Sequence, residues 1–222
     1  MYLPNDYAIS TRHYPVLYMQ DGQNLFDLKS SFSGEWEIDE YLDSIDFAGI
    51  VIGIDNGGET RINEYNPNDT EAFGKGLGRE YLDRIVKILK PYIDKQFRTL
   101  ADRDHTSVAG SSMGGLIAFY AGLYHPKVFG SVGVFSPSFW LVKNIEEQAK
   151  TVRSKFYRGQ RYYFYGGGKE GENLVESLQS MAVLLQSKHH CLTTVSINEK
   201  GTHSESNWRK IFPSFYTWLM KA

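Results

Sequence analysis

A serine in the middle of the chain has the surroundings of a catalytic nucleophile. Ser112 lies within residues 106–116, TSVAGSSMGGL, where a short apolar run leads through G-x-S-x-G into the helical pattern LIAFYAGLY. A strand, this motif and a helix in succession hold a serine on a sharp turn with its hydroxyl exposed. Glycines at 110 and 114 leave room for the turn, and the N–H groups that open the helix favour a developing negative charge. The pattern predicts a nucleophile, against the alternative of a Gly/Ser-rich turn without chemistry.

A serine hydroxyl needs a base to accept its proton and a third group to orient that base. In the chain order that accompanies a serine on such a turn, the acid comes next and the histidine last. His203 follows a predicted strand in a glycine-containing loop, and we predict that it is the base. His189 and His190 end a predicted helix, where the helix dipole explains them without catalysis.

The acid is expected after the strand that lies between the serine and the histidine. Residues 162–165 form that strand, which breaks at three glycines and leads into the sequence KEGE. Glu170 is nearer to the strand end and is the preferred acid, with Glu172 in reserve and Glu199 as a weaker third choice. A solvated charged loop is the alternative interpretation of these glutamates.

Two backbone N–H groups are needed to bind the oxyanion. One should come from Met113, the residue after the nucleophile, and the other from the turn DGQN that follows an early strand, with Gln23 as the expected donor. No Cys/His cluster has the spacing of metal ligands, so we expect no metal and no cofactor. Asp102 and Asp104 are interpreted as a solvated turn.

Apolar, β-branched segments alternate with helical patterns along the chain. Residues 56–78 are polar and predict a long surface loop that borders a site. Pro91 is expected to bend or shorten the end of its helix. Strands joined by helical crossovers predict an α/β fold with a mostly parallel central sheet, helices on both faces and ligands at the carboxyl ends of the strands. The predicted strands are residues 14–20, 49–55, 106–109, 131–136, 162–165 and 193–198, and the predicted helices are residues 36–45, 79–96, 116–124, 145–153, 174–188 and 208–220.

The composition is that of an ordinary soluble globular protein, and we expect a single domain over residues 1–222. With 41% hydrophobic residues, 23% charged residues and a net charge of -2, there is no electrostatic case for binding nucleic acid or an anionic membrane. No apolar run approaches the ~20 residues that span a bilayer, and the first residues do not form a signal peptide. A cytoplasmic protein is therefore expected. The single cysteine, Cys191, excludes an intramolecular disulfide.

The sequence resembles the putative esterases of the α/β-hydrolase superfamily, a group that includes esterase D-like enzymes, feruloyl and acetyl-xylan esterases, ferric-enterobactin esterases and mycolyltransferases. This resemblance implies the α/β-hydrolase fold, with Ser112 as nucleophile, Glu170 as acid, His203 as base and the amides of Gln23 and Met113 as the oxyanion hole. The similar segments run through nearly the whole chain in family order: YPVLYMQDGQNLFD (14–27), GIDNGGETRINEY (53–65), VAGSSMGGLIAFYAGLYHPKVFGSVGVFSPSFW (108–140), YGGGKEGE (165–172) and GTHSESNW (201–208).

The chain departs from the family pattern in two places. Thr202 stands before the histidine, where the family commonly has a second glycine. Family members also usually carry one or two further strands before the segment LP-x-x-Y, so the N-terminal edge strands are expected to be reduced here. An exposed sheet edge would favour a homodimer through that edge.

The expected function is that of a serine esterase that hydrolyses a small-acyl, sugar or aromatic (feruloyl or acetyl) ester through an acyl-enzyme. A siderophore trilactone esterase and an acyltransferase with the same catalytic residues are the alternatives, and a binding module with a dead site is a remote one. The partner is thus a small-molecule ester. Asn24, Phe26, Trp140 and Trp208 are predicted to contact it, although most large aromatic residues belong to the core.

Overall fold

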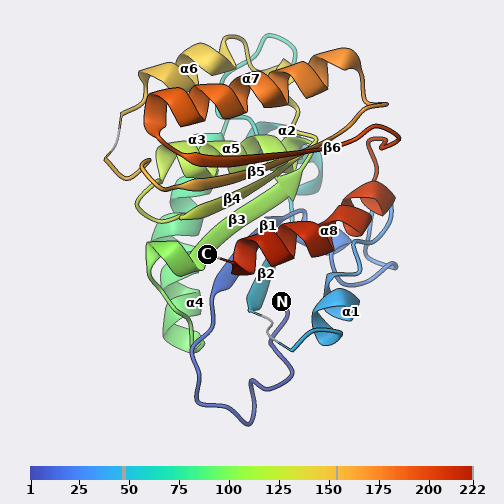
Figure 1. Cartoon of the computed structure of the whole chain (residues 1–222), viewed down its shortest axis with the longest axis vertical. Helices are drawn as coiled ribbons and strands as arrows, with labels where there is room; N and C mark the ends of the chain where they lie inside the picture. Colours follow the sequence, from blue (N-terminus) through green and yellow to red (C-terminus); the bar gives the residue numbers. More distant parts are fainter. Residues whose placement is uncertain (47–48, 154, 222) are drawn as a thin grey trace.

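A parallel sheet with helices on both faces forms the centre of the computed structural model (Figure 1), which describes residues 1–46, 49–153 and 155–221. Six strands lie in the order β2-β1-β3-β4-β5-β6, and every neighbouring pair is parallel. The six predicted strands are confirmed, with small shifts at their ends. The strands are β1 (Val16–Gln20), β2 (Ile50–Ile54), β3 (Thr106–Ser111), β4 (Ser131–Phe135), β5 (Arg161–Gly167) and β6 (Leu192–Asn198).

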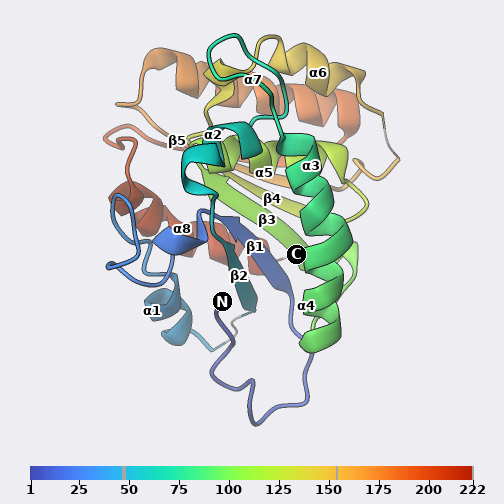
Figure 2. The same cartoon turned by 180° about the vertical axis from the view of Figure 1, so that it is seen from behind.

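The helices divide between the two faces of the sheet. Helices α1 and α8 lie on the face seen in Figure 1, and α3, α4 and α5 are seen from the opposite side in Figure 2. Both views agree with the expected α/β-hydrolase layering. The helices are α1 (Ile38–Asp43), α2 (Arg61–Glu64), α3 (Gly78–Arg84), α4 (Lys90–Gln96), α5 (Met113–Tyr124), α6 (Ile145–Thr151), α7 (Glu172–His189) and α8 (Glu205–Met220).

The sheet separates two hydrophobic clusters. Successive residues of a strand point to opposite faces, so Val16 and Tyr18 of β1 join the cluster under α3, α5 and α7, whereas Leu17 and Met19 join the cluster under α1 and α8. Because both faces are covered, all five residues of β1 are buried. This explains why the central strands are apolar throughout instead of alternating.

The helix around Pro91 continues to Gln96, so the expected shortening was wrong, and the expected bend stays a prediction. A π-helical segment, Ile85–Leu89, joins α3 to α4, and the helix continues to Gln96. A proline ring clashes with the carbonyl four residues before it, here that of Lys87. This carbonyl lies inside the wider π turn, which makes room for the ring.

The N-terminal edge of the sheet is partly covered. Tyr2 forms an antiparallel bridge to Val51 of β2, with N–H to O distances of 2.9 and 3.2 Å. Within the described residues, this bridge is the only pairing on the outer edge of β2. It reduces the exposed edge that the sequence suggested, and a homodimer through β2 stays a prediction.

Residues 56–78 contain more structure than the predicted loop. A 3₁₀ turn, Gly58–Thr60, leads directly into α2, and Tyr65 is fully buried. Elements this short do not complete enough turns to show a helical period in the sequence. The prediction of a plain surface loop was therefore wrong for this part.

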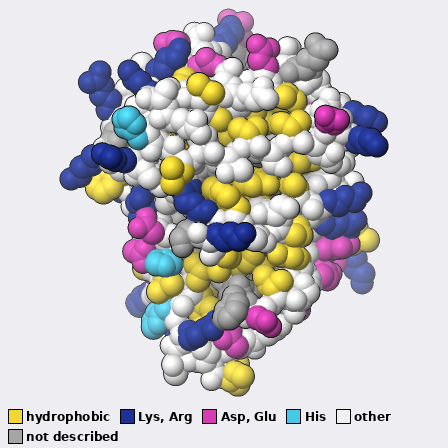
Figure 3. Space-filling model, in the orientation of Figure 1, with side chains coloured by type: hydrophobic (Ala, Val, Ile, Leu, Met, Phe, Trp, Pro, Cys, Tyr) yellow, Lys and Arg dark blue, Asp and Glu magenta, His cyan; other side chains and the backbone are white. Residues whose placement is uncertain are grey.

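The surface in Figure 3 has positive and negative side chains around its outline and hydrophobic ones mostly towards the middle. Charges of both signs are interspersed there, as the small net charge suggests. Within the described ranges, no helix combines the length and the apolar character needed to cross a bilayer.

Candidate active site

Ser112 occupies the sharp turn between β3 and α5. Its backbone angles, φ 57° and ψ -122°, lie where non-glycine residues are rarely found. The N–H of Ser112 donates to the carbonyl of Phe135 on β4 over 2.9 Å, which helps to hold this conformation. Gly110 is required for space, because a Cβ there would lie 2.5 Å from the carbonyl oxygen of Gly114. The strain is thus carried by the serine, and the glycines make room for it.

The turn opens into a cavity of about 1000 Å³ that both Ser112 and His203 line. The cavity lies at the carboxyl ends of the strands, where parallel sheets bind ligands. In the described part of the chain, the hydroxyl of Ser112 has one hydrogen-bonding neighbour, Ser138 Oγ at 3.4 Å, and no hydrogen bond joins it to His203. The cavity is lined by Asp21, Gln23, Asn24, Ser30, Ser31, Phe32, Ser33, Asn56, Gly58, Glu59, Arg61, Ile62, Ser111, Ser112, Met113, His203, Ser204, Glu205 and Trp208.

Glu170 binds the imidazole of His203. Its Oε2 lies 2.7 Å from His203 Nδ1, while its Oε1 accepts the N–H of Gly167 and the hydroxyl of Ser136, both over 2.7 Å. The Glu170 side chain is only 3% exposed, whereas that of His203 is 47% exposed. A carboxylate can only accept, so Nδ1 carries the proton and Nε2 is left able to accept one.

The loops that carry this pair are packed directly on each other. A Cβ at Gly167 would lie 2.4 Å from the carbonyl oxygen of Gly201, so glycine is needed where the loops meet. The N–H of Lys169 donates to the same carbonyl over 3.0 Å. Thr202, the departure from the family pattern, accepts a hydrogen bond from the Asn207 side chain over 2.8 Å. A threonine therefore fits this loop.

Trp208 contacts both the serine that binds Glu170 and the ring of His203. Its Nε1 donates to the hydroxyl of Ser136 over 2.9 Å, and its ring meets that of His203 edge-on at a centroid distance of 4.9 Å. Ser136 has a φ of 42° at the end of β4. Segments of β4, β5 and α8 thereby converge on one carboxylate.

The predicted oxyanion donors both line the cavity. Gln23 lies in the 3₁₀ turn Gly22–Asn24 that follows β1, and Met113 opens α5. The first N–H groups of a helix have no partner within it, so both residues occupy positions from which such a group can bind an anion.

A partly buried ion pair holds the turn that contains Gln23. Asp21 has a φ of 56°, and its carboxylate accepts two hydrogen bonds from Arg61, over 2.7 and 2.8 Å, and one from Asn56 over 2.7 Å. Its N–H donates to the hydroxyl of Tyr65 over 3.1 Å. Burial, first of all, raises the pKa of Tyr65 far above its usual value, which keeps this hydroxyl neutral.

The predicted substrate contacts divide into two groups. Asn24 and Trp208 line the cavity, and Asn24 Oδ1 accepts the N–H of Phe32 over 2.9 Å. Phe26 packs against the cluster under α1 and α8, and Trp140 is 77% exposed in a 3₁₀ turn after β4. Neither Phe26 nor Trp140 lines the cavity.

The reserve candidates do not replace Glu170 or His203. Glu172 opens α7, and its side chain lies outside the described part of the structure. Glu199 forms no hydrogen bond with His203 within the described residues, where Glu170 occupies Nδ1. His189 is buried, with Nε2 2.7 Å from the carbonyl oxygen of Ala149, and His190 caps α7. Both histidines have structural roles, as expected.

Several residues around the cavity were not among the site residues predicted from the sequence. Phe32 and Glu205 line it, Arg61 fixes the turn of Gln23, Ser136 binds the acid and Ser138 neighbours Ser112. The segment GIDNGGETRINEY was a usable signal for Arg61, because it belongs to the family pattern. The others carried no local signal, since single serines and glutamates are common in loops.

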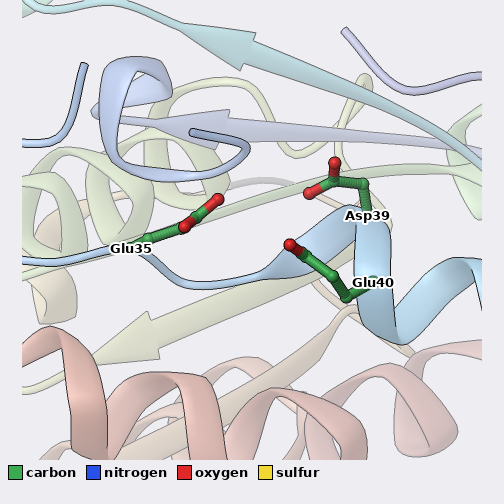
Figure 4. A group of neighbouring side chains, drawn as sticks. All are labelled: Glu35, Asp39 and Glu40. Carbon is green, nitrogen blue, oxygen red and sulfur yellow. The ribbon is translucent and has the colours of Figure 1, made fainter. Parts of the chain in front are cut away.

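A cluster of carboxylates lies away from the cavity. Glu35, Asp39 and Glu40 face one another around the start of α1 (Figure 4), with ligand atoms within 4.8 Å. Burial, and then repulsion by Glu40, raises the pKa of Glu35. None of the three lines the cavity, and acidic groups of this kind are common without an ion. Asp102 accepts from the N–H groups of Asp104 and His105, so it is the turn that was expected.

Comparison with known proteins identifies the family. Residues 1–218 match the protein family described as putative esterase. The chain belongs to the putative esterase family. Family membership makes it a carboxylic ester hydrolase, as the resemblance implied.

Curated relatives within this family include proteins of different size. The chain is 29% identical over 213 residues to the uncharacterized protein YbbA of Bacillus subtilis (strain 168). This match covers 90% of the chain and 78% of YbbA. It is 26% identical over 190 residues to an endo-1,4-beta-xylanase/feruloyl esterase of Xylanibacter ruminicola, a match that covers 82% of this chain and 24% of the relative. It is 43% identical over 83 residues to an iron(III) enterobactin esterase of Dickeya dadantii, a match that covers 37% of this chain and 17% of the relative. Each of these last two matches thus spans a quarter or less of the relative's length.

Solved structures share the fold of the family. An IroE-like serine hydrolase from Shewanella oneidensis superposes with a TM-score of 0.73 at 20% identity, covering 96% of this chain and 75% of that one. The enterobactin esterase Fes from Shigella flexneri, solved in the presence of enterobactin, gives 0.74 at 21% identity, covering 96% and 53%. Together with the parallel sheet, these likenesses establish the α/β-hydrolase fold.

Proposed function

We propose that the chain hydrolyses a small-acyl, sugar or aromatic ester through an acyl-enzyme on Ser112. His203 Nε2 takes the proton of the Ser112 hydroxyl while Oγ attacks the ester carbonyl. The oxyanion is stabilised by the N–H groups of Gln23 and Met113. His203 then gives the proton to the leaving alcohol, which departs and leaves the acyl-enzyme. Water attacks this ester with the help of His203, which releases the acid and restores Ser112.

The observation that carries this proposal is the 2.7 Å contact between Glu170 and His203 beside the cavity that Ser112 lines. A buried carboxylate orients the ring and stabilises the imidazolium that forms when His203 accepts a proton. Catalytic hydrogen bonds are often long or unformed in ligand-free enzymes and shorten in complexes. We therefore expect the bond between Ser112 and His203 to form once substrate fills the cavity.

A fluorophosphonate probe and a panel of esters test this mechanism. p-Nitrophenyl acetate and butyrate, methyl ferulate and acetylated xylan cover the proposed acyl and alcohol groups. Ser112→Ala and His203→Ala should each reduce kcat/KM by at least ~10³-fold, because such residues act as a unit. Glu170→Ala should reduce it less.

Ser138, the serine whose hydroxyl lies near that of Ser112 in the fold, provides the matched control. Ser138→Ala removes the hydroxyl that lies 3.4 Å from Ser112 Oγ, and the probe should still label Ser112. Label found on Ser138, or turnover that persists in Ser112→Ala, would refute the proposed mechanism.

A further inference from the structure

The two edges of the sheet differ in how far they are covered. At the β2 edge, Tyr2 pairs with Val51. At the β6 edge, no group of the described residues pairs with the outer side of the strand. β6 has the sequence LTTVSIN, without the charged side chain, proline or bulge that commonly protects an edge strand. The β6 edge is therefore open to a further strand.

The hydrogen bonds at the two ends of β6 show which of its backbone groups point outwards. The N–H of Leu192 and the carbonyl of Asn198 both bond to residues that flank β5, over 2.8 Å in each case. The direction of bonding alternates from one residue of a strand to the next. Thr193, Val195 and Ile197 therefore direct their N–H and C=O groups to the open side.

A second copy of β6 that runs antiparallel matches this pattern. With Val195 opposite Val195, Thr193 of each strand lies opposite Ile197 of the other, so each outward N–H meets an outward carbonyl. The same register sets Thr194 opposite Ser196, on the face of the sheet away from α7. Hydroxyl side chains of this kind pair favourably between neighbouring strands, and no like charges oppose each other within β6.

The charged groups at the two ends of β6 are complementary in this register. Glu199 directly follows β6, is exposed and, among the described residues, has no ion pair or side-chain hydrogen bond. At the other end, Arg158, His190 and Leu192 line a hollow of about 430 Å³. Glu199 of each copy is brought to this hollow in the other, where the Arg158 cation is exposed. Lys200 falls opposite His190, and a neutral imidazole can accept a hydrogen bond from it.

Helix α7 adds a second strip to the same interface. It packs on β5 and β6, and antiparallel pairing of the two β6 strands puts both copies of α7 on one face of the joined sheet. Neighbouring strands lie ~4.8 Å apart, so the two helices come to about 10 Å, an ordinary spacing for packed helices. The exposed side chains in the middle of α7 carry no charge that opposes this contact. They are Gln179, Ser180, Val183, Gln186 and Ser187.

We propose that two copies of the chain associate through β6, edge to edge and antiparallel about a two-fold axis at Val195, which joins their sheets into one. This is the edge opposite to the one that the sequence suggested. β6 does not line the cavity of Ser112, so the inference is independent of the proposed function.

A matched pair of double variants tests the register. Thr194→Lys with Ser196→Lys sets like charges opposite each other on both sides of the axis, so the dimer dissociation constant should rise at least about tenfold. Thr194→Lys with Ser196→Glu sets opposite charges at the same positions and should leave the protein dimeric. Sedimentation equilibrium over a range of protein concentrations measures the constant. Thr11→Lys, at an exposed position before β1, is the control and should not change it.

Amide hydrogen exchange tests the same pairing without any substitution. The N–H groups of Thr193, Val195 and Ile197 should exchange slowly in the dimer and faster when dilution favours the monomer. Those of Thr194 and Ser196 bond towards β5 and should stay protected at every concentration.

Three outcomes would overturn the inference. The first is a monomer at all concentrations, with rapid exchange at Val195. The second is a dimer that the two lysines leave intact, because it must then form through another surface. The third is equal weakening of the dimer by both double variants, which would refute the register. The exchange measurement remains decisive if a double variant fails to fold.

Discussion

The hydroxyl of Ser136 donates a 2.7 Å hydrogen bond to Glu170, on the carboxylate oxygen opposite the one that faces His203. Ser136 is almost fully buried, and its φ of 42° is one that glycine adopts more readily. Trp208 in turn donates to the same hydroxyl, which leaves the Ser136 proton directed at the acid. The orientation of Glu170 thus depends on a strained serine that directly follows a different strand, β4.

Replacing Ser136 with glycine should reduce activity, and the relief of its strained φ should offset part of the stability lost with its two hydrogen bonds. Glycine tolerates the φ of 42° at this position, so the backbone is unstrained, but the carboxylate loses a charge-assisted hydrogen bond. Such a bond contributes about 1.5–3 kcal/mol, and we expect kcat to fall about tenfold to a hundredfold. The less stabilised carboxylate is a stronger base, so the acid limb of the kcat/KM profile should move to higher pH. Thermal unfolding is the control, and a large fall in Tm or an unchanged kcat would contradict this role.

Replacing Trp208 with phenylalanine should have a smaller effect of the same kind. The variant keeps a smaller aromatic ring beside His203 and removes the N–H that donates to the Ser136 hydroxyl over 2.9 Å. Because the two residues act on one carboxylate, their effects should not add in the double variant with Ser136→Gly. Kinetics of the two single variants and the double variant measure this coupling. Fully additive losses would mean that Trp208 acts independently of Ser136.

Replacing Arg61 with glutamine should lower both stability and kcat/KM. The change leaves the buried Asp21 carboxylate with Asn56 as its remaining side-chain donor among the described residues. An uncompensated charge of this kind costs up to about 3–5 kcal/mol when fully buried, and the turn of Gln23 loses its support. Urea unfolding measures the first effect and ester kinetics the second. The double variant with Asp21→Asn should recover part of the stability, and no recovery would show that the ion pair is not the cause.

His125 should make the protein less stable in mild acid. Burial lowers the pKa of His125 below its usual value of 6.5, so between these two values the unfolded chain binds more protons than the folded one. The free energy of unfolding therefore falls as pH decreases from about 6.5 through the folded-state pKa. His125→Gln should flatten that part of the curve, as measured by urea unfolding between pH 7 and pH 5. A curve with unchanged slope would assign the acid sensitivity to other groups.

Much of the architecture could be predicted from local sequence. Apolar β-branched runs, glycine turns and the chain order of serine, acid and histidine were enough for six parallel strands, the bend at Ser112 and the pairing of Glu170 with His203. The strands and the bend depend on residues that are neighbours in the sequence. The meeting of acid and base follows from the rule that the carboxyl ends of parallel strands lie at one edge of the sheet, so it too can be predicted from the order of the segments.

Tertiary structure alone decided which side chains meet at the site. The contact of Ser136 with Glu170, the ion pair of Asp21 with Arg61 and the place of Glu205 in the cavity wall join segments that only folding brings together. The same is true of the aromatics, since Phe26 and Phe32 are close in sequence, yet one packs into the core and the other lines the cavity. Residue type sets what a side chain can bond to, whereas the packing of helices on the sheet sets what it reaches. Sequence therefore determined the chemistry available here, and the fold determined its partners.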